Sequence, residues 1–146
     1  MDILSNFGET LHELISDVNL TPEAFAQKVN IDRSVVYKYL RKEVLPTLPN
    51  LIAIADFLQC SVDYLIGVSP VNPETKYRQT PPFAIRFQSL LSEKGLTRYA
   101  FLKEHHFAKQ SVDDWFHGKR CPSVENLINL SKCFGCSVDY LLGRES

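Results

Sequence analysis

The sequence predicts an all-α protein: two tandem five-helix bundles joined by a Pro-rich linker. Three observations lead to this prediction. The second half of the chain repeats the first, apolar residues recur with helical spacing in each copy, and prolines gather between the copies. Of the 146 residues, 45% are hydrophobic and 23% are charged, which is typical of a packed protein and excludes a disordered one.

The internal repeat is ungapped. With Phe7 aligned on Phe83, the two copies run in register as far as Gly67 on Gly143, and about 19 of about 61 positions are identical. The longest shared block is CSVDYLIG at 60–67 over CSVDYLLG at 136–143. We therefore expect an N-terminal domain over 1–67 and a C-terminal domain over 83–146.

Residues 68–82 separate the copies and hold four of the chain's eight prolines. Proline fixes φ and lacks the backbone N–H, so this density excludes a helix and favours a stiff, semi-extended linker.

The first two helices of the N-terminal copy are marked by apolar spacing and by a cap. Residues three and four apart form the apolar stripe of the first helix: Phe7, Leu11, Leu14, Ile15 and Val18. Thr21 and Pro22 predict the start of the second helix, because Thr caps a helix and the first turn does not need the N–H that Pro lacks. Asn30 ends this helix, since Asn tolerates the left-handed conformation of such a turn.

The remaining three helices of this copy each begin after a capping side chain. The caps are Asp32, Thr47 and Ser61. The third helix is expected to turn Val36 and Leu40 inward and to stop at Pro46. The fourth carries an apolar side made of Leu48, Leu51, Ile52, Ala55 and Leu58. The fifth is short and ends at Gly67, so each copy contains about five short helices.

These residues resemble a known family. The segment 20–36, LTPEAFAQKVNIDRSVV, resembles the Cro/C1-type (XRE-like, lambda-repressor-like) helix-turn-helix family, as do GKRCPSVENL at 118–127 and SVDYLLG at 137–143. The likeness extends over about 120 of the 146 residues. It implies lambda-repressor-like five-helix bundles of transcription regulators, commonly dimeric, which bind operators in the major groove.

The third helix of the first copy supplies the candidate base-reading residues. With Val36 and Leu40 inward, its outward side chains are expected to be Arg33, Ser34, Val35, Tyr37 and Lys38. The resemblance adds backbone contacts at Arg41 and Lys42, and the start of the second helix adds Thr21. Residues 33–42 hold four basic side chains and no acidic one, although the copy as a whole is acidic. Such a local basic patch favours DNA over a merely solvated face.

The second copy departs from this pattern. Asp113 and Asp114 take the places of two outward residues of the first copy, and a carboxylate repels phosphates unless a cytosine amino group donates to it. Ala108 replaces a capping Asp, and His106 stands in the turn where the family prefers Gly. Residues that remain compatible with DNA contact are Lys109, Gln110, Ser111, Lys119 and Arg120. We expect a weaker or differently tuned reader, partly converted to an interaction role.

Other features favour structural roles. Cys133 and Cys136 form half of a zinc motif whose second half is absent. Cys60 and Cys136 stand at matching places, where the resemblance implies a small apolar core residue, so buried thiols are expected here rather than metal ligands. Trp115 is expected to pack the third helix of its copy against the bundle. The sequence has no Gly-rich phosphate loop and no catalytic motif, which predicts neither an enzyme nor a cofactor. It also shows no signal peptide or membrane-length apolar run, so a cytoplasmic protein is expected.

The sequence therefore predicts a sequence-specific double-stranded-DNA-binding transcriptional regulator of the repressor type, with no evident small-molecule ligand. The second copy would engage a neighbouring half-site or pair with the first as an intrachain pseudo-dimer, and a homodimer stays open. The alternative is a protein-interaction module, such as an antirepressor or adaptor, which kept the bundle without operator reading. Its support is the net charge of −1 and the two carboxylates Asp113 and Asp114.

Overall fold

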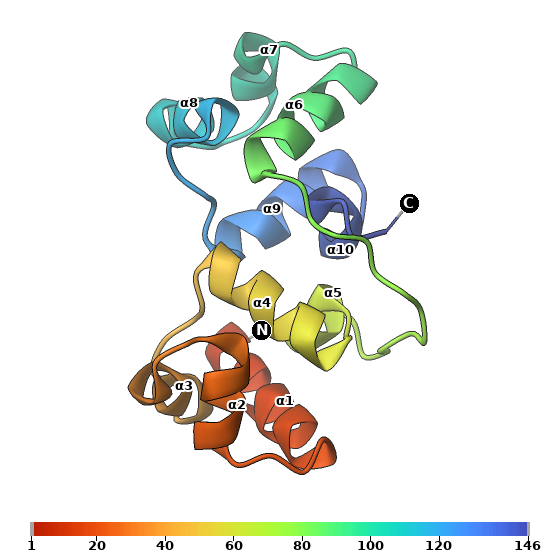
Figure 1. Ribbon diagram of the computed structural model, residues 1–146. Helices are drawn as coiled ribbons and strands as arrows, with labels where there is room; N and C mark the ends of the chain where they lie inside the picture. The colour runs from red at the N-terminus through yellow and green to blue at the C-terminus, as the bar shows by residue number, and fades with distance from the viewer. Residues whose placement is uncertain (1, 146) are drawn as a thin grey trace. The chain divides into compact units, whose positions relative to one another are not determined.

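The computed structural model describes residues 2–145, and within this range every regular element is an α-helix (Figure 1). The helices fall into two compact units, one that reaches Tyr77 and one that begins at Arg78. This division lies inside the Pro-rich segment 68–82. The all-α fold class predicted from the repeat and the helical spacing is confirmed.

Each unit contains five helices in the same order. The N-terminal unit has α1 (Ile3–Asp17), α2 (Pro22–Val29), α3 (Arg33–Leu40), α4 (Leu48–Leu58) and α5 (Val62–Leu65). The C-terminal unit has α6 (Phe83–Glu93), α7 (Arg98–Glu104), α8 (Lys109–His117), α9 (Val124–Phe134) and α10 (Val138–Leu142). Among the residues described, no helix is long and apolar enough to cross a membrane.

The predicted helix starts are confirmed by side-chain caps. Thr21, Asp32, Thr47 and Ser61 each accept a hydrogen bond from a backbone N–H in the first turn of α2, α3, α4 and α5. Asn30 ends α2 with a φ of 56°, the left-handed conformation expected of it. In the C-terminal unit Ala108 precedes α8 and makes no side-chain cap, as its methyl group requires.

Helix α1 begins at Ile3, because the Asp2 carboxylate caps it. Two boundary predictions for the first unit were wrong. Val18 follows the last turn of α1 and is 44% exposed, so it does not extend the apolar stripe. Helix α3 ends at Leu40 rather than at Pro46, because Lys42 adopts a φ of 64° and terminates it.

The core of the N-terminal unit holds α3 against α1. Phe7 and Tyr39 are buried and meet edge to face, with ring centroids 5.4 Å apart. The inward face of α3 is therefore Val36 and Tyr39, while Leu40, predicted to face inward, is half-buried. In α4 the stripe is Leu48, Leu51, Ile54 and Ala55, and the predicted members Ile52 and Leu58 are half-buried at its edges.

The core of the C-terminal unit is centred on Phe87 of α6. Its ring contacts Phe101, Trp115 and Phe134 at centroid distances of 5.6, 6.1 and 6.3 Å. Trp115 is 3% exposed, which confirms that it packs α8 against the bundle. Cys60 is buried as predicted for a small apolar side chain, whereas Cys133 and Cys136 are only half-buried.

Candidate nucleic-acid interface

Helices α2 and α3 form a helix-turn-helix in the N-terminal unit. Each has eight residues, and the turn between them is built on the left-handed Asn30 and on Ile31, which is buried. The backbone N–H of Ile31 donates to the carbonyl of Ala26 over 3.0 Å, which fixes the turn. Because Val36 and Tyr39 anchor α3, its opposite face is left for solvent.

The predicted outward side chains of α3 differ in their exposure. Arg33, Ser34 and Lys38 are exposed, while Val35 and Tyr37 are half-buried. Among the described residues, neither Arg33 nor Lys38 forms an ion pair. Arg33 also borders a hollow of about 530 Å³ beside the turn. The two cations of α3 are therefore available to a ligand.

The Ser34 hydroxyl is engaged by the cap of its own helix. It donates to Oδ1 of Asp32 over 2.6 Å, and the Ser34 backbone N–H donates to the same oxygen over 2.8 Å. These two hydrogen bonds hold the pKa of Asp32 below its ordinary value. The Ser34 oxygen can then still accept a hydrogen bond, but its proton is already used.

Three other predicted contacts of this unit face carboxylates. The Tyr37 hydroxyl donates to Glu23, Nε of Arg41 donates to Glu43, and Nζ of Lys42 lies 2.8 Å from Oε1 of Glu9. The hydrogen bond from Lys42 and its charge hold the pKa of Glu9 below the ordinary value. Sequence reasoning missed Glu9 and Glu23, because they approach from α1 and α2 through the tertiary fold. Glu43, two residues from Arg41, was visible in the sequence.

Thr21 lies at the start of α2, as predicted. Its hydroxyl accepts from the Ala24 N–H over 3.1 Å, and its side chain is exposed. The N-terminus of a helix carries a partial positive charge, which suits a phosphate.

The turn of the C-terminal unit has a different backbone. Helix α7 ends at Glu104, and the capping residue His105 is extended, with φ of −128° and ψ of 148°. His106, which corresponds to Asn30, does not have a positive φ. The turn therefore needs neither Gly nor Asn at that position, although the sequence comparison singled it out.

The lysine on the outward face of α8, Lys109, is paired with Asp113 of the same helix. Asp113 accepts from Nζ of Lys109 over 2.8 Å and from Nη1 of Arg98 over 3.1 Å. The Lys109 hydrogen bond, with the charges of Lys109 and Arg98, holds the pKa of Asp113 below its ordinary value. The Arg98 guanidinium also lies 4.4 Å from the centre of the Phe116 ring. Lys109, a predicted DNA contact, is thus already paired.

The expectation that Asp114 turns its carboxylate toward DNA was wrong. Asp114 is 8% exposed and accepts from Nε2 of Gln110 over 3.0 Å. Its Oδ2 lies 3.8 Å from Nε of Arg120. Gln110, another predicted contact, therefore bonds within its own helix.

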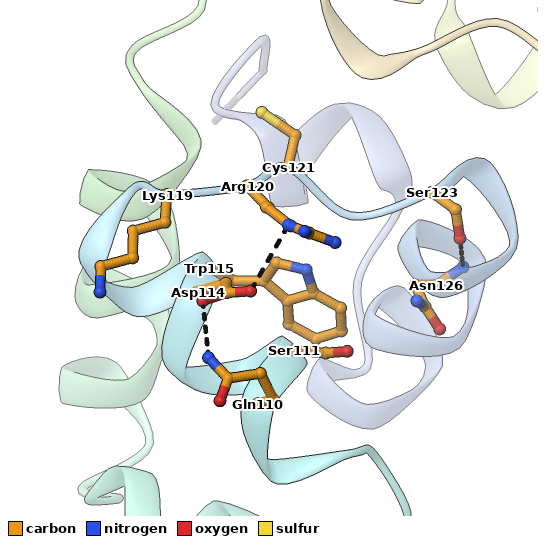
Figure 2. A pocket seen from close by; sticks show the side chains of 9 residues that line it. All are labelled: Gln110, Ser111, Asp114, Trp115, Lys119, Arg120, Cys121, Ser123 and Asn126. Carbon is orange, nitrogen blue, oxygen red and sulfur yellow. Dashed lines mark hydrogen bonds and ion pairs between the residues drawn. The ribbon is translucent and has the colours of Figure 1, made fainter.

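Four of the predicted contacts line one cavity of about 560 Å³: Gln110, Ser111, Lys119 and Arg120 (Figure 2). Asp114 also lines it, as do Ser123 and Asn126 at the start of α9, which were not predicted. A signal for Ser123 existed, since it caps α9 as Thr47 caps α4. Within residues 2–145 no group of three or more His, Cys, Asp or Glu side chains is placed to hold a metal.

Comparison with known proteins agrees with this geometry. The sequence profile of the helix-turn-helix family HTH_3, of the XRE/Cro/C1 type, matches residues 13–65 and again residues 90–141. Neither the curated proteins nor the solved structures include a match. The two matched regions cover more than half of the chain. The first contains α2 and α3, and the second contains the corresponding helices α7 and α8. The family points to double-stranded DNA binding and a transcription-regulatory role. The chain belongs to the HTH_3 helix-turn-helix family, in two tandem copies.

Proposed function

We propose that the protein is a sequence-specific transcriptional regulator, of the repressor type, whose N-terminal unit reads the major groove with α3. The observation that carries the proposal is the state of Arg33 and Lys38. Both are exposed on a helix that Val36 and Tyr39 fix to the bundle, and neither forms an ion pair among the described residues. An unpaired Arg near the start of a recognition helix suits the O6 and N7 acceptors of guanine.

The residues around Arg33 and Lys38 support the proposed placement of α3 in the major groove. Val35 can contact a thymine methyl group, the Ser34 oxygen can accept from a base amino group, and Lys38 can reach a base or a phosphate. Thr21 and the N-terminus of α2 would face the phosphate backbone, as would Lys42 once it leaves Glu9. Tyr37 and Arg41 would also have to leave carboxylates before contacting DNA.

The deciding experiment is the selection of bound duplexes from a random pool, followed by binding measurements on the enriched motif. Arg33→Ala should weaken binding to the selected site by about 1–3 kcal/mol and relax one base position. Lys28→Ala removes the same charge from the last turn of α2 and is the matched control. If no motif is enriched at low salt, the proposal is wrong.

The spacing of the enriched motif also tests the assembly. Half-sites about 34 Å apart would indicate two recognition helices one turn apart, from a homodimer or from an intrachain pseudo-dimer. A single half-site would indicate that only one unit reads bases.

A protein-interaction module is the second candidate. Its support is that Glu9, Glu23 and Glu43 satisfy three donors that the DNA proposal assigns to the operator. This candidate predicts no enriched motif, and no effect of Arg33→Ala on whatever duplex binding is seen.

A further inference from the structure

We propose that the C-terminal unit binds the sugar–phosphate backbone of the same duplex through Lys119 and Arg120, without reading its sequence. The inference rests on the proposed function of the N-terminal unit and assigns the second unit a different task. It follows from a comparison of the two units, because the predicted DNA contacts that are already held by carboxylates differ between them.

In the N-terminal unit the two cations that would read bases are available, and the two cations that would hold the backbone are paired. Arg33 and Lys38 form no ion pair among the described residues. Arg41 and Lys42, after the end of α3, are paired with Glu43 and Glu9. This unit therefore has cations available to read bases. Its backbone-contacting cations are already paired, so we expect its sequence-independent affinity for DNA to be low.

In the C-terminal unit the assignment is reversed. On the face of α8, Lys109 is held by Asp113, and Gln110 is held by Asp114. Two exposed cations instead lie in the loop after α8. There Lys119 and Arg120 occupy the positions that Glu43 and Val44 occupy in the first unit. The base-reading face is thus neutral, while the loop after it is positive.

The loop presents these two cations on a fixed backbone. Gly118 ends α8 in the left-handed conformation, with a φ of 76°, and the Lys119 N–H donates to the carbonyl of Asp114 over 2.9 Å. Lys119 is exposed and has no ion pair among the described residues. The Arg120 side chain is 81% exposed, and its Nε lies 3.8 Å from Asp114, a separation at which the guanidinium remains open to a second partner.

The cavity beside this loop has the chemistry of a phosphate contact. Lys119 and Arg120 share its lining with Asp114 and with Ser123 and Asn126, at the N-terminal end of the eleven-residue helix α9 (Figure 2). The Asp114 carboxylate already accepts from Gln110 and lies 3.8 Å from Arg120, so a single carboxylate stands against two cations. The two cations, the neutral polar side chains and the helix N-terminus suit the repeated phosphates of a duplex. They carry no pattern of donors and acceptors matched to one base pair, since Gln110, the residue suited to adenine, is already bonded.

The test compares two duplexes of equal length and composition, the selected site and a shuffled version, with the full chain at several salt concentrations. Lys119→Ala/Arg120→Ala should lower the affinity for both duplexes by the same factor. The slope of log K against log salt should become shallower by about two, since each phosphate contact contributes about 0.9. Arg33→Ala should lower the affinity for the selected duplex alone.

The matched control is Lys94→Ala/Lys132→Ala, which removes the same charge from the end of α6 and the last turn of α9. It should leave the salt slope close to that of the unmodified chain. Fluorescence of Trp115, which lies under the cavity, checks that each variant is folded.

The inference is overturned if Lys119→Ala/Arg120→Ala weakens only the selected duplex, because the unit would then read sequence. It is also overturned if the double variant binds both duplexes like the unmodified chain. In either case a normal response to Arg33→Ala leaves the proposed function intact. If the unmodified chain binds neither duplex, both proposals fail.

Discussion

Nζ of Lys42 lies 2.8 Å from Oε1 of Glu9, although the two residues are 33 positions apart in the chain. The contact joins the loop after α3 to α1. A phosphate that binds Lys42 must displace this carboxylate, so the ion pair lowers the net gain from that contact. On the proposed function, Glu9 should therefore limit how strongly the N-terminal unit binds any duplex.

Glu9→Gln should raise the affinity for selected and shuffled duplexes alike by about two- to fivefold, the range expected for a surface ion pair. The salt slope should steepen by about one, because Lys42 becomes free to neutralise a phosphate. Fluorescence anisotropy at several salt concentrations measures both quantities. Glu13→Gln, on the exposed side of the same helix, is the control for overall charge. An equal gain in the two variants would show that the Lys42 contact is irrelevant.

Ala108→Ser should stabilise the C-terminal unit by about 1 kcal/mol, because it supplies the side-chain cap that α8 lacks. The backbone at Ala108, with φ of −63° and ψ of 132°, already has the conformation of a capping residue. Urea unfolding followed by the fluorescence of Trp115, the chain's one tryptophan, reports on this unit. Asp32→Ala should weaken the N-terminal unit instead and leave the Trp115 transition in place. An unchanged midpoint for Ala108→Ser would refute the prediction.

Acid should weaken the C-terminal unit through Asp113. The Lys109 hydrogen bond and the nearby charges hold its folded-state pKa below the ordinary value of 3.8. The stabilisation from these pairs is therefore complete above about pH 4 and is lost as the pH falls through the folded-state pKa. Asp113→Asn has no such contribution to lose, so its stability should change less between pH 6 and pH 3. Urea unfolding by Trp115 fluorescence at both values decides this, and equal losses would exclude Asp113 as the group responsible.

The sequence was sufficient for features that depend on neighbouring residues. The caps at Thr21, Thr47 and Ser61 and the left-handed Asn30 were predicted, because each involves a side chain or a backbone conformation within three residues of the helix end. The repeat then extended the same fold to the second half of the chain.

Contacts between helices could not be predicted in the same way. The sequence showed a basic stretch over 33–42, but the carboxylates of Glu9 and Glu23 that meet it come from other helices. The burial of Asp114 was missed for a related reason, since its position in the repeat corresponds to the exposed Lys38. Two copies of one fold therefore place different charges at equivalent positions, and only the packed structure shows which are paired.

Arg144 is a further residue that the repeat did not reveal. It lies just beyond the last aligned position, and its counterpart in the first copy is Val68. In the structure Arg144 is 0% exposed, and its Nη1 donates to Oδ1 of Asp139, itself 2% exposed, over 2.6 Å. The Arg144 backbone N–H also donates to the Asp139 carbonyl over 2.8 Å, which closes the turn after α10.

Arg144→Met should destabilise the C-terminal unit by about 1.5–3 kcal/mol, because the buried Asp139 carboxylate loses the charged hydrogen bond from Arg144. Asp139→Asn/Arg144→Met should be less destabilised than the sum of the two single variants, since the double variant loses that one hydrogen bond only once. Urea unfolding of all four proteins by Trp115 fluorescence gives the coupling energy. Lys132→Met, an exposed change of the same type on α9, should stay within about 0.5 kcal/mol of the unmodified chain. Additive effects of the two single variants would mean that the burial of Arg144, rather than its bond to Asp139, stabilises this end of the unit.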